Sequence, residues 1–167
     1  YKDLEMNRMN LILDGKMPAV IEKVSLLAWT TTPWTLPGNV ALALGKDMEY
    51  AMVYSPNFPN ELLILAQDRL ESFASVLGEY AVLFVQKGEQ LVGTKYLPLF
   101  DYYAQDEQLE NRERGWKIYA ADFVTTTDGT GIVHIAPAFG EDDMQLGKAE
   151  HLPFVQHVKM DGTMKDE

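Results

Sequence analysis

Short runs of β-forming residues, each bounded by turn residues, recur along this chain and limit the folds open to it. The runs are rich in β-branched, aromatic and aliphatic side chains, with Gly, Pro, Asn or Asp between them. Turn signals such as Lys87-Gly88 and Asp128-Gly129 separate several of them. The sequence therefore predicts strands at 24–31, 40–44, 49–54, 61–65, 81–86, 116–121, 131–135 and 154–158.

Two segments have a helical pattern instead. The apolar residues of 66–77 share one stripe at helical spacing, namely Leu70, Phe73, Ala74 and Leu77, and Gly78 is a natural stop. The second helix is predicted at 141–151, where three carboxylates in the first turn suit the helix macrodipole. Because strands and helices do not alternate, a doubly wound parallel fold is disfavoured. We expect a mainly β, barrel-like domain with helical decorations (α+β).

Composition excludes several classes of protein. A chain of 167 residues with 47% hydrophobic residues has the size of one domain and can bury a core. Its apolar runs fall short of the roughly 18 residues of a membrane helix, so no membrane partner is expected. The absence of Cys excludes disulfides and thiolate chemistry and fits a cytoplasmic location. The net charge of −11 argues against a free-standing nucleic-acid binder.

Common catalytic motifs are missing from the sequence. There is no G-x-S-x-G elbow, no Cys nucleophile and no Gly-rich phosphate loop. Metal binding by His134 with Asp142 or Asp143 is conceivable, but the chain has only three His and no H-E-x-x-H spacing. We therefore predict no metal site.

Two stretches carry most of the chemical information, WTTTPWTLPGN at 29–39 and GTGIVHIAPAFGEDD at 129–143. In the first, Thr30, Thr31 and Thr32 could reflect β-propensity before the turn at Pro33. Alternatively, their hydroxyls and backbone N–H groups could orient a water or polarise a carbonyl. Trp34 is open to two interpretations as well, a core residue or the wall of a pocket.

The second stretch offers one His and a final carboxylate. His134 lies in an apolar strand pattern and could be a hydrogen-bonded core residue or a pocket residue. Asp143 falls in the first turn of the predicted helix, where the ionised form is favoured. An ionised Asp143 suits an acceptor for a cationic ammonium better than a general acid. If the fold brings both stretches together, they form a pocket with donors, an aromatic wall and an anionic end.

Together the two stretches resemble the editing domain inserted into the class I aminoacyl-tRNA synthetases for branched aliphatic amino acids. Its isoleucine branch is known for W-T-T-T-P-W-T-L-P and G-T-G-I-V-H-x-A-P-A-F-G-x-x-D, which 29–37 and 129–143 reproduce. The valyl and leucyl branches typically carry T-T-R-P-E/D-T, where this chain has Thr32 and Trp34. LVGTKYLPLF at 91–100 resembles the G-x-x-Y-x-P-L-F segment of the family, whereas 1–20 and 101–115 match nothing.

The resemblance implies a domain organisation. Residues 21–158 would form the editing domain, with 1–20 a linker or leading segment and 159–167 an exit segment toward the rest of a synthetase. Because the chain begins with Tyr1 rather than Met, we expect a fragment of a longer protein. The H-I-G-H and K-M-S-K-S signatures of the class I core are absent, so we expect no aminoacylation by this fragment.

The resemblance also implies a reaction, the hydrolysis of valyl-tRNA(Ile) and of valyl-adenylate. A pocket for isoleucine cannot firmly reject valine, because one methylene is worth only about 1–3 kcal/mol, a range for which the isoleucine enzyme of this family is itself the standard example. A second, smaller site would clear valine and exclude isoleucine by size. The implied partners are the 3′ end of aminoacylated tRNA(Ile), valyl-adenylate and the remaining domains of the parent synthetase.

Residue roles follow from the same resemblance. Asp143 would hold the α-ammonium of the substrate, and Thr30, Thr31 and Thr32 would bind substrate and adenosine and position the water. Trp34 and His134 would bound the side-chain pocket. We expect positioned-water hydrolysis without a cofactor, since ATP and Mg²⁺ would serve only the absent synthetic core. The alternatives are a non-catalytic β domain that binds a small ligand, or a valyl-tRNA synthetase editing domain that clears threonine; the missing Arg at Thr32 counts against the latter.

Overall fold

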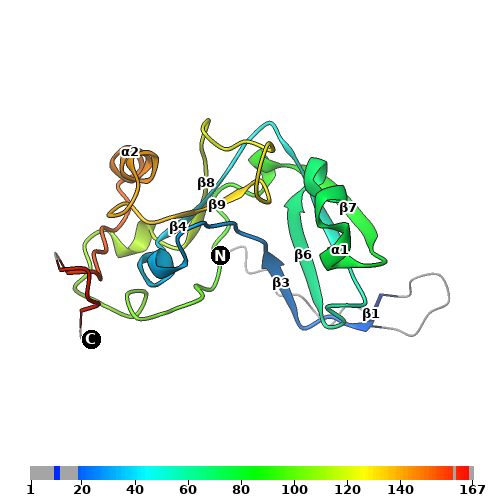
Figure 1. Cartoon of the computed structure of the whole chain (residues 1–167), viewed down its shortest axis with the longest axis horizontal. Coiled ribbons are helices and arrows are strands. Elements are labelled where there is room, and N and C mark those ends of the chain that lie inside the picture. The colour runs from blue at the N-terminus through cyan, green and yellow to red at the C-terminus, as the bar shows by residue number, and fades with distance from the viewer. Residues whose placement is uncertain (1–9, 12–18, 160, 166–167) are drawn as a thin grey trace.

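The computed structural model describes residues 10–11, 19–159 and 161–165, and its strands form three sheets (Figure 1). The largest has the order β3 (Lys23–Leu26), β6 (Glu61–Ala66), β5 (Glu49–Tyr54) and β7 (Ala81–Lys87). The second has the order β8 (Lys117–Ala120), β4 (Ala41–Leu44) and β9 (Ile132–Ile135). A small pair joins β1 (Asn10–Leu11) to β2 (Ala19–Val20).

The helical elements are short. The described residues form two α-helices, α1 (Ala74–Leu77) and α2 (Glu141–Glu150). Five 3-10 turns accompany them: η1 (Pro33–Gly38), η2 (Gln67–Arg69), η3 (Glu71–Phe73), η4 (Gly88–Gln90) and η5 (Arg112–Arg114). In the described part of the chain, no helix has the length and apolar character that crossing a membrane requires. The predicted mainly β fold with helical decorations is confirmed.

Strand pairing is mixed. The pairs β3–β6 and β4–β8 are parallel, whereas β5 is antiparallel to both its neighbours and β4 is antiparallel to β9. The register of β4 with β9 places Leu42 opposite His134. The ladders of the described residues form separate sheets.

One continuous segment joins the two larger sheets. Leu27 N–H donates to Ile64 O of β6 at 3.0 Å, whereas Trp29 N–H donates to Ile132 O of β9 at 3.1 Å. The predicted strand 24–31 is therefore wrong beyond Leu26, because the chain leaves one sheet there and pairs with the other. This crossing brings Thr30, the first residue of the Thr triplet, to a cavity that residues of both sheets line.

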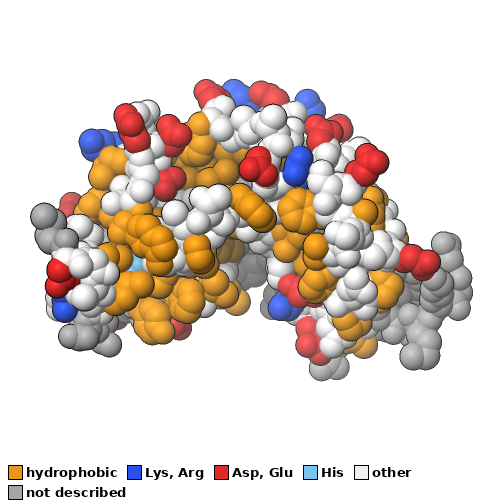
Figure 2. Space-filling view, in the orientation of Figure 1, with side chains coloured by type: hydrophobic (Ala, Val, Ile, Leu, Met, Phe, Trp, Pro, Cys, Tyr) orange, Lys and Arg blue, Asp and Glu red, His pale blue; other side chains and the backbone are white. Residues whose placement is uncertain are grey.

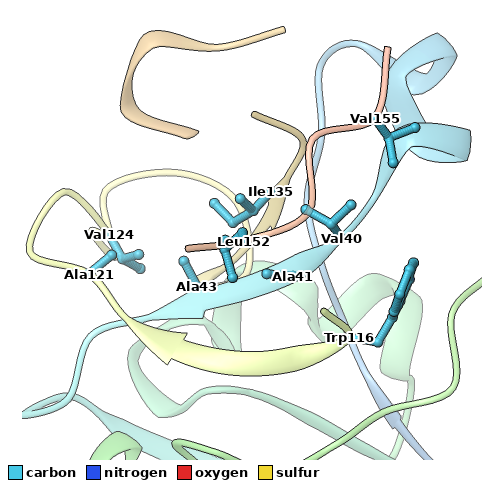
Figure 3. Packing of buried hydrophobic residues seen from close by; sticks show 9 residues of the cluster. All are labelled: Val40, Ala41, Ala43, Trp116, Ala121, Val124, Ile135, Leu152 and Val155. Carbon is cyan, nitrogen blue, oxygen red and sulfur yellow. The ribbon is translucent and has the colours of Figure 1, made fainter. Parts of the chain in front are cut away.

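Strand β4 is the middle strand of its sheet, and both its faces are buried. Ala41 and Ala43 face the cluster that includes Ile135 and Leu152 (Figure 3), while Leu42 and Leu44 face a second cluster. Successive side chains of a strand point to opposite faces, so four consecutive apolar residues can serve two cores. A third cluster packs the far face of the large sheet against α1, with Ala51, Val53, Leu63, Leu65, Leu70 and Leu77.

The predicted helix over 66–77 is wrong for most of its length. The segment forms η2, η3 and then α1, which ends where Gly78 adopts a φ of 65°. Leu70 and Leu77 are buried, but Ala74 is exposed, so the apolar residues do not share one stripe. Arg69 extends from η2 and donates to Gly129 O at 2.7 Å, which ties this segment to the loop before β9.

Two other segments bear on the predictions. Residues 154–158 form no strand, and within them Val158 makes an isolated bridge to Met164. The helix predicted at 141–151 is confirmed as α2. Of the predicted leading segment 1–20, residues 1–9 and 12–18 lie outside the described residues.

Tyr50 links the two larger sheets through its hydroxyl, and we expect Tyr50→Phe to lower the free energy of unfolding. The hydroxyl donates to Gly131 O at 2.7 Å and accepts from Gly45 N–H at 3.0 Å, and the side chain is 1% exposed. Its loss leaves two buried backbone groups unpaired, which costs about 1–3 kcal/mol. Urea unfolding measures the change, and Tyr54→Phe on the same strand is the control. Equal effects of the two substitutions would contradict the link.

Candidate functional site

The Thr triplet forms a turn in which hydroxyls and backbone groups bond to one another. Thr30 Oγ1 accepts from Thr32 N–H at 3.1 Å and lies 3.4 Å from Thr32 Oγ1. Thr32 O in turn accepts from Thr35 N–H at 2.9 Å, at the start of η1. Pro33 opens η1 without cost, because a first helical position needs no N–H donor.

His134 is buried, at 7% exposure, and both of its ring nitrogens have partners. Nδ1 lies 2.9 Å from Asn39 Nδ2, and Nε2 lies 3.0 Å from Thr35 Oγ1. An amide nitrogen can only donate, so Nδ1 accepts and Nε2 carries the ring hydrogen. Nε2–H then donates to Thr35 Oγ1, which donates to Thr32 O at 2.8 Å.

The partner of His134 is itself fixed. Asn39 Oδ1 accepts from the Tyr96 hydroxyl at 2.5 Å, and Asn39 Nδ2 also donates to Ala41 O at 2.8 Å. These bonds determine the orientation of the amide and hence the tautomer of His134. A chain of hydrogen bonds thus runs from Tyr96 through Asn39 and His134 to Thr35.

The same surroundings keep His134 neutral. Burial, and to a smaller extent repulsion from His157, lower its pKa from the ordinary 6.5 to about 4. Because Asn39 occupies the lone pair of Nδ1, His134 has no free nitrogen to act as a general base. It can serve as a rigid wall and as a fixed hydrogen-bond donor.

A cavity of about 740 Å³ lies between the two sheets, where Figure 2 shows the surface hollowed. Thr30, Asn39 and His134 contribute polar groups to its lining, and Lys23 lies at its β3 side. Its apolar lining includes Leu36, Leu42, Ile64, Leu91 and Ile118. The volume and the mixture of apolar and polar lining residues suit a small-molecule site.

The structure divides the predicted site residues into two groups. Thr30 and His134 line the cavity, whereas Thr31, Thr32, Trp34 and Asp143, all described, do not. Thr31 and Thr32 are exposed beside it. The role of each residue stays a prediction.

Asp143 lies in the first turn of α2, as predicted, and is half-buried. Its Oδ2 accepts from Ala136 N–H at 3.4 Å, two residues after His134. Burial raises the pKa of Asp143, the Ala136 bond opposes that rise, and the charge of Asp142 adds to it. The direction is opposite to the one expected from the helix start alone, because burial outweighs the other influences.

Trp34 is 50% exposed, so it is not a core residue. Its ring meets the edge of Phe139 at a centroid distance of 5.4 Å and an interplanar angle of 85°. This contact and the Thr35–His134 hydrogen bond join 29–39 to 129–143 directly. The two stretches of the sequence do come together.

Three residues of the site escaped sequence reasoning: Thr35, Asn39 and Tyr96. Thr35 and Asn39 lie inside the first stretch, and Tyr96 lies inside LVGTKYLPLF. The only indication in the sequence that they belong to the site was their position inside segments that resemble the family. Among the described residues, no three His, Asp or Glu side chains gather closely enough to hold a metal ion.

The depressed pKa of His134 predicts that acid destabilises the fold. The unfolded chain takes up this proton near pH 6.5 and the folded chain only near pH 4, so the unfolded state binds more protons between these values. The free energy of unfolding should therefore fall by about 2 kcal/mol from pH 7 to about pH 5. Urea unfolding of the wild type and of His134→Gln tests this, since the variant should lose less. Equal losses would contradict a neutral, buried His134.

Comparison with known sequences gives a consistent set of relatives, although no protein-family model matches the chain. It is 45% identical over 141 residues to the isoleucine–tRNA ligase of Treponema denticola and 47% identical over 145 residues to that of Clostridium novyi. A probable cytoplasmic isoleucine–tRNA ligase of Dictyostelium discoideum is 46% identical over 125 residues. These matches cover 78%, 87% and 75% of the chain, but only 12%, 13% and 11% of the relatives.

Solved structures show the same fold. GlLeuRS-CP1 matches with a TM-score of 0.61 at 23% identity, covering 75% of this chain and 44% of that one. The editing domain of P. falciparum cytosolic leucyl-tRNA synthetase matches with a TM-score of 0.57 at 17% identity, covering 77% and 48%. The P. knowlesi counterpart gives 0.56 at 17% identity, covering 77% and 52%. At these identities the likeness concerns the fold alone.

Proposed function

The chain belongs to the isoleucine–tRNA ligase family, as the counterpart of one segment of its members, and on this premise we propose that it is a hydrolytic editing domain. Its substrates would be valyl-tRNA(Ile) and valyl-adenylate, and correctly charged isoleucyl-tRNA(Ile) would be spared. The remaining domains of a parent synthetase and the 3′ end of the tRNA would be its partners. The cytoplasm stays the predicted location; the Dictyostelium discoideum relative is named as cytoplasmic.

The observation that carries the proposal is the fixed, neutral His134 on the cavity wall, bonded to the turn that follows the Thr triplet. A size filter needs a wall that does not yield, because the difference between valine and isoleucine is one methylene. Hydrogen bonds on both sides of the ring hold His134 in one orientation. That rigidity supports the role of a steric limit.

The hydrolytic step would use a positioned water. Thr30 lines the cavity and its Oγ1 accepts from Thr32 N–H, so the hydroxyl hydrogen can be donated to a bound ester or water. His134 is engaged at both nitrogens and is therefore not the base that activates this water. Orientation of the water and polarisation of the ester carbonyl would supply the acceleration. No metal or cofactor is proposed.

The substrate's ammonium group would be held by Asp143. A carboxylate half-buried beside β9 forms a stronger ion pair than one fully in water, since the local dielectric is lower. Its contact with Ala136 N–H fixes one oxygen, Oδ2, and leaves the other for the ammonium. The role requires the ionised carboxylate; burial raises the pKa of Asp143, and the positive charge of a bound ammonium would favour the ionised form.

A deacylation assay with matched tRNAs tests the proposal. The chain should release valine from valyl-tRNA(Ile) and leave isoleucyl-tRNA(Ile) intact. Protein in excess over tRNA is needed, because the net charge of −11 predicts weak tRNA binding. Saturable binding of a valyl-adenosine analogue without turnover would instead identify a binding domain. Release of threonine from threonyl-tRNA(Val), with valyl-tRNA(Ile) untouched, would identify a valyl-type editing domain.

A further inference from the structure

The carbonyl group of Trp34 lacks its normal partner within η1. In a 3-10 helix, the carbonyl of residue i accepts from the N–H of residue i+3. For Trp34 that residue is Pro37, which has no N–H. Backbone carbonyls are nearly always hydrogen-bonded, so Trp34 O needs a donor other than the N–H at position 37.

His157 supplies that donor. Its Nε2 lies 2.9 Å from Trp34 O, and because a carbonyl only accepts, Nε2 carries the hydrogen. His157 lies in the irregular segment after α2 and is 5% exposed. It was the one member of this contact for which the sequence suggested no role.

The ring of His157 is also packed between two neighbours, Phe139 and Gly38. It meets Phe139 at a centroid distance of 5.0 Å and an angle of 64°, and Phe139 meets Trp34 in turn. On the other side lies Gly38, where an added Cβ would come within 2.8 Å of His157 Nδ1. The ring therefore occupies the space that a side chain at Gly38 would take.

A purely space-filling role does not account for this residue. Within the described residues, His157 Nδ1 is buried without a hydrogen-bond partner, which is unfavourable. An apolar ring would fill the same space without that penalty. What only the imidazole adds is the hydrogen bond to Trp34 O.

We propose that His157 is a positioning residue: by holding Trp34 and Phe139 it holds η1, whose Thr35 bonds His134 on the cavity wall, and thereby fixes the size limit of the editing site. It contacts 29–39 through Trp34 and 129–143 through Phe139, so it clamps the two stretches from outside. The specificity part of this proposal rests on the proposed editing function. The clamp itself rests only on the contacts between His157, Trp34 and Phe139.

Three substitutions separate the contributions of the clamp. His157→Phe keeps an aromatic ring and removes the donor, His157→Gln keeps an N–H donor and removes the ring, and Gly38→Ala displaces the imidazole from the opposite side. Each is compared with the wild type by the indole N–H signal of Trp34 in ¹⁵N-labelled protein, assigned with Trp34→Phe. The second measurement is the ratio of deacylation of valyl-tRNA(Ile) to isoleucyl-tRNA(Ile).

We expect His157→Phe and Gly38→Ala to shift or broaden the Trp34 signal and to lower the ratio about tenfold, within the range that one methylene spans. His157→Gln should restore both measurements close to the wild-type values. An unchanged Trp34 signal and ratio in His157→Phe would overturn the proposal, as would a Gln variant no better than the Phe variant.

Two further outcomes are distinguishable. If the wild type hydrolyses neither tRNA, the editing function fails, while the Trp34 signal still decides the clamp. If the variants do not fold, hydrogen exchange in the wild-type chain tests the clamp. The Nε2–H of His157 should resist exchange with solvent, in contrast to that of exposed His151. Rapid exchange at His157 would then overturn the clamp.

Discussion

Replacing Asp143 with Ala should lower kcat/KM for valyl-tRNA(Ile) about a hundredfold. A hydrogen bond to a charged group contributes about 1.5–3 kcal/mol, and every 1.4 kcal/mol corresponds to about a factor of ten. The loss should be similar in Asp143→Asn, which keeps an oxygen acceptor for Ala136 N–H but carries no charge. Single-turnover deacylation with each variant measures the effect.

Asp142 provides the matched control for Asp143. It is the preceding residue of α2, it is exposed, and Asp142→Ala removes the same charge from the same helix turn. Its activity should stay within about twofold of the wild type, as for a surface substitution away from the site. Full activity of Asp143→Ala in a folded chain would refute the ammonium-binding role.

The second large effect is expected at His134. His134→Ala should let the chain hydrolyse isoleucyl-tRNA(Ile), raising that rate about tenfold or more, because the removed ring exceeds the methylene that separates the two amino acids. The same substitution leaves Asn39 and Thr35 without their partner, so the free energy of unfolding should fall by about 1–3 kcal/mol. Deacylation of both tRNAs and urea unfolding measure the two effects.

Leu97→Ala is the control for His134→Ala, because it tests whether removing any lining side chain is enough to admit isoleucine. Leu97 lines the same cavity but is 95% exposed, so Leu97→Ala should leave the discrimination unchanged. If isoleucyl-tRNA(Ile) survives His134→Ala in a folded chain, the steric limit lies in another part of the site. Trp34→Ala is then the next substitution to test, since Trp34 is the other predicted wall.

The fold could be predicted in outline because its strands are specified locally. β5, β6 and β7 carry dense β-branched and aliphatic residues between turn signals, and each appears within one residue of its predicted bounds. Segment 66–77 failed for a physical reason: helical spacing of apolar residues does not fix which of them the sheet will cover. Here Leu70 and Leu77 are covered and Ala74 is not.

The candidate site was predictable where it repeats the family's motifs and not where it depends on distant contacts. His134 and the Thr triplet were identified from the sequence, and a pocket was predicted only if the fold brought their two stretches together. The hydrogen bonds that fix His134 could not be predicted, because Tyr96 lies 57 residues from Asn39 in the sequence and Asn39 lies 95 residues from His134. Likewise, the absence of an N–H at Pro37 is visible in the sequence, but the donor that replaces it is 123 residues from Trp34. Only the fold pairs such residues.

The segment that leaves β3 and reaches β9 also has a consequence for the order of folding. Leu27 N–H is bonded within the large sheet and Trp29 N–H within the small one, so the two amides should become protected at different times if the sheets form separately. The Thr triplet follows immediately and can take its final conformation only after both events. A chain in which both sheets had formed but the Thr triplet had not yet taken its final conformation would not discriminate between amino acids. Fidelity in such a protein would be the last property to appear on folding and the first to disappear on heating.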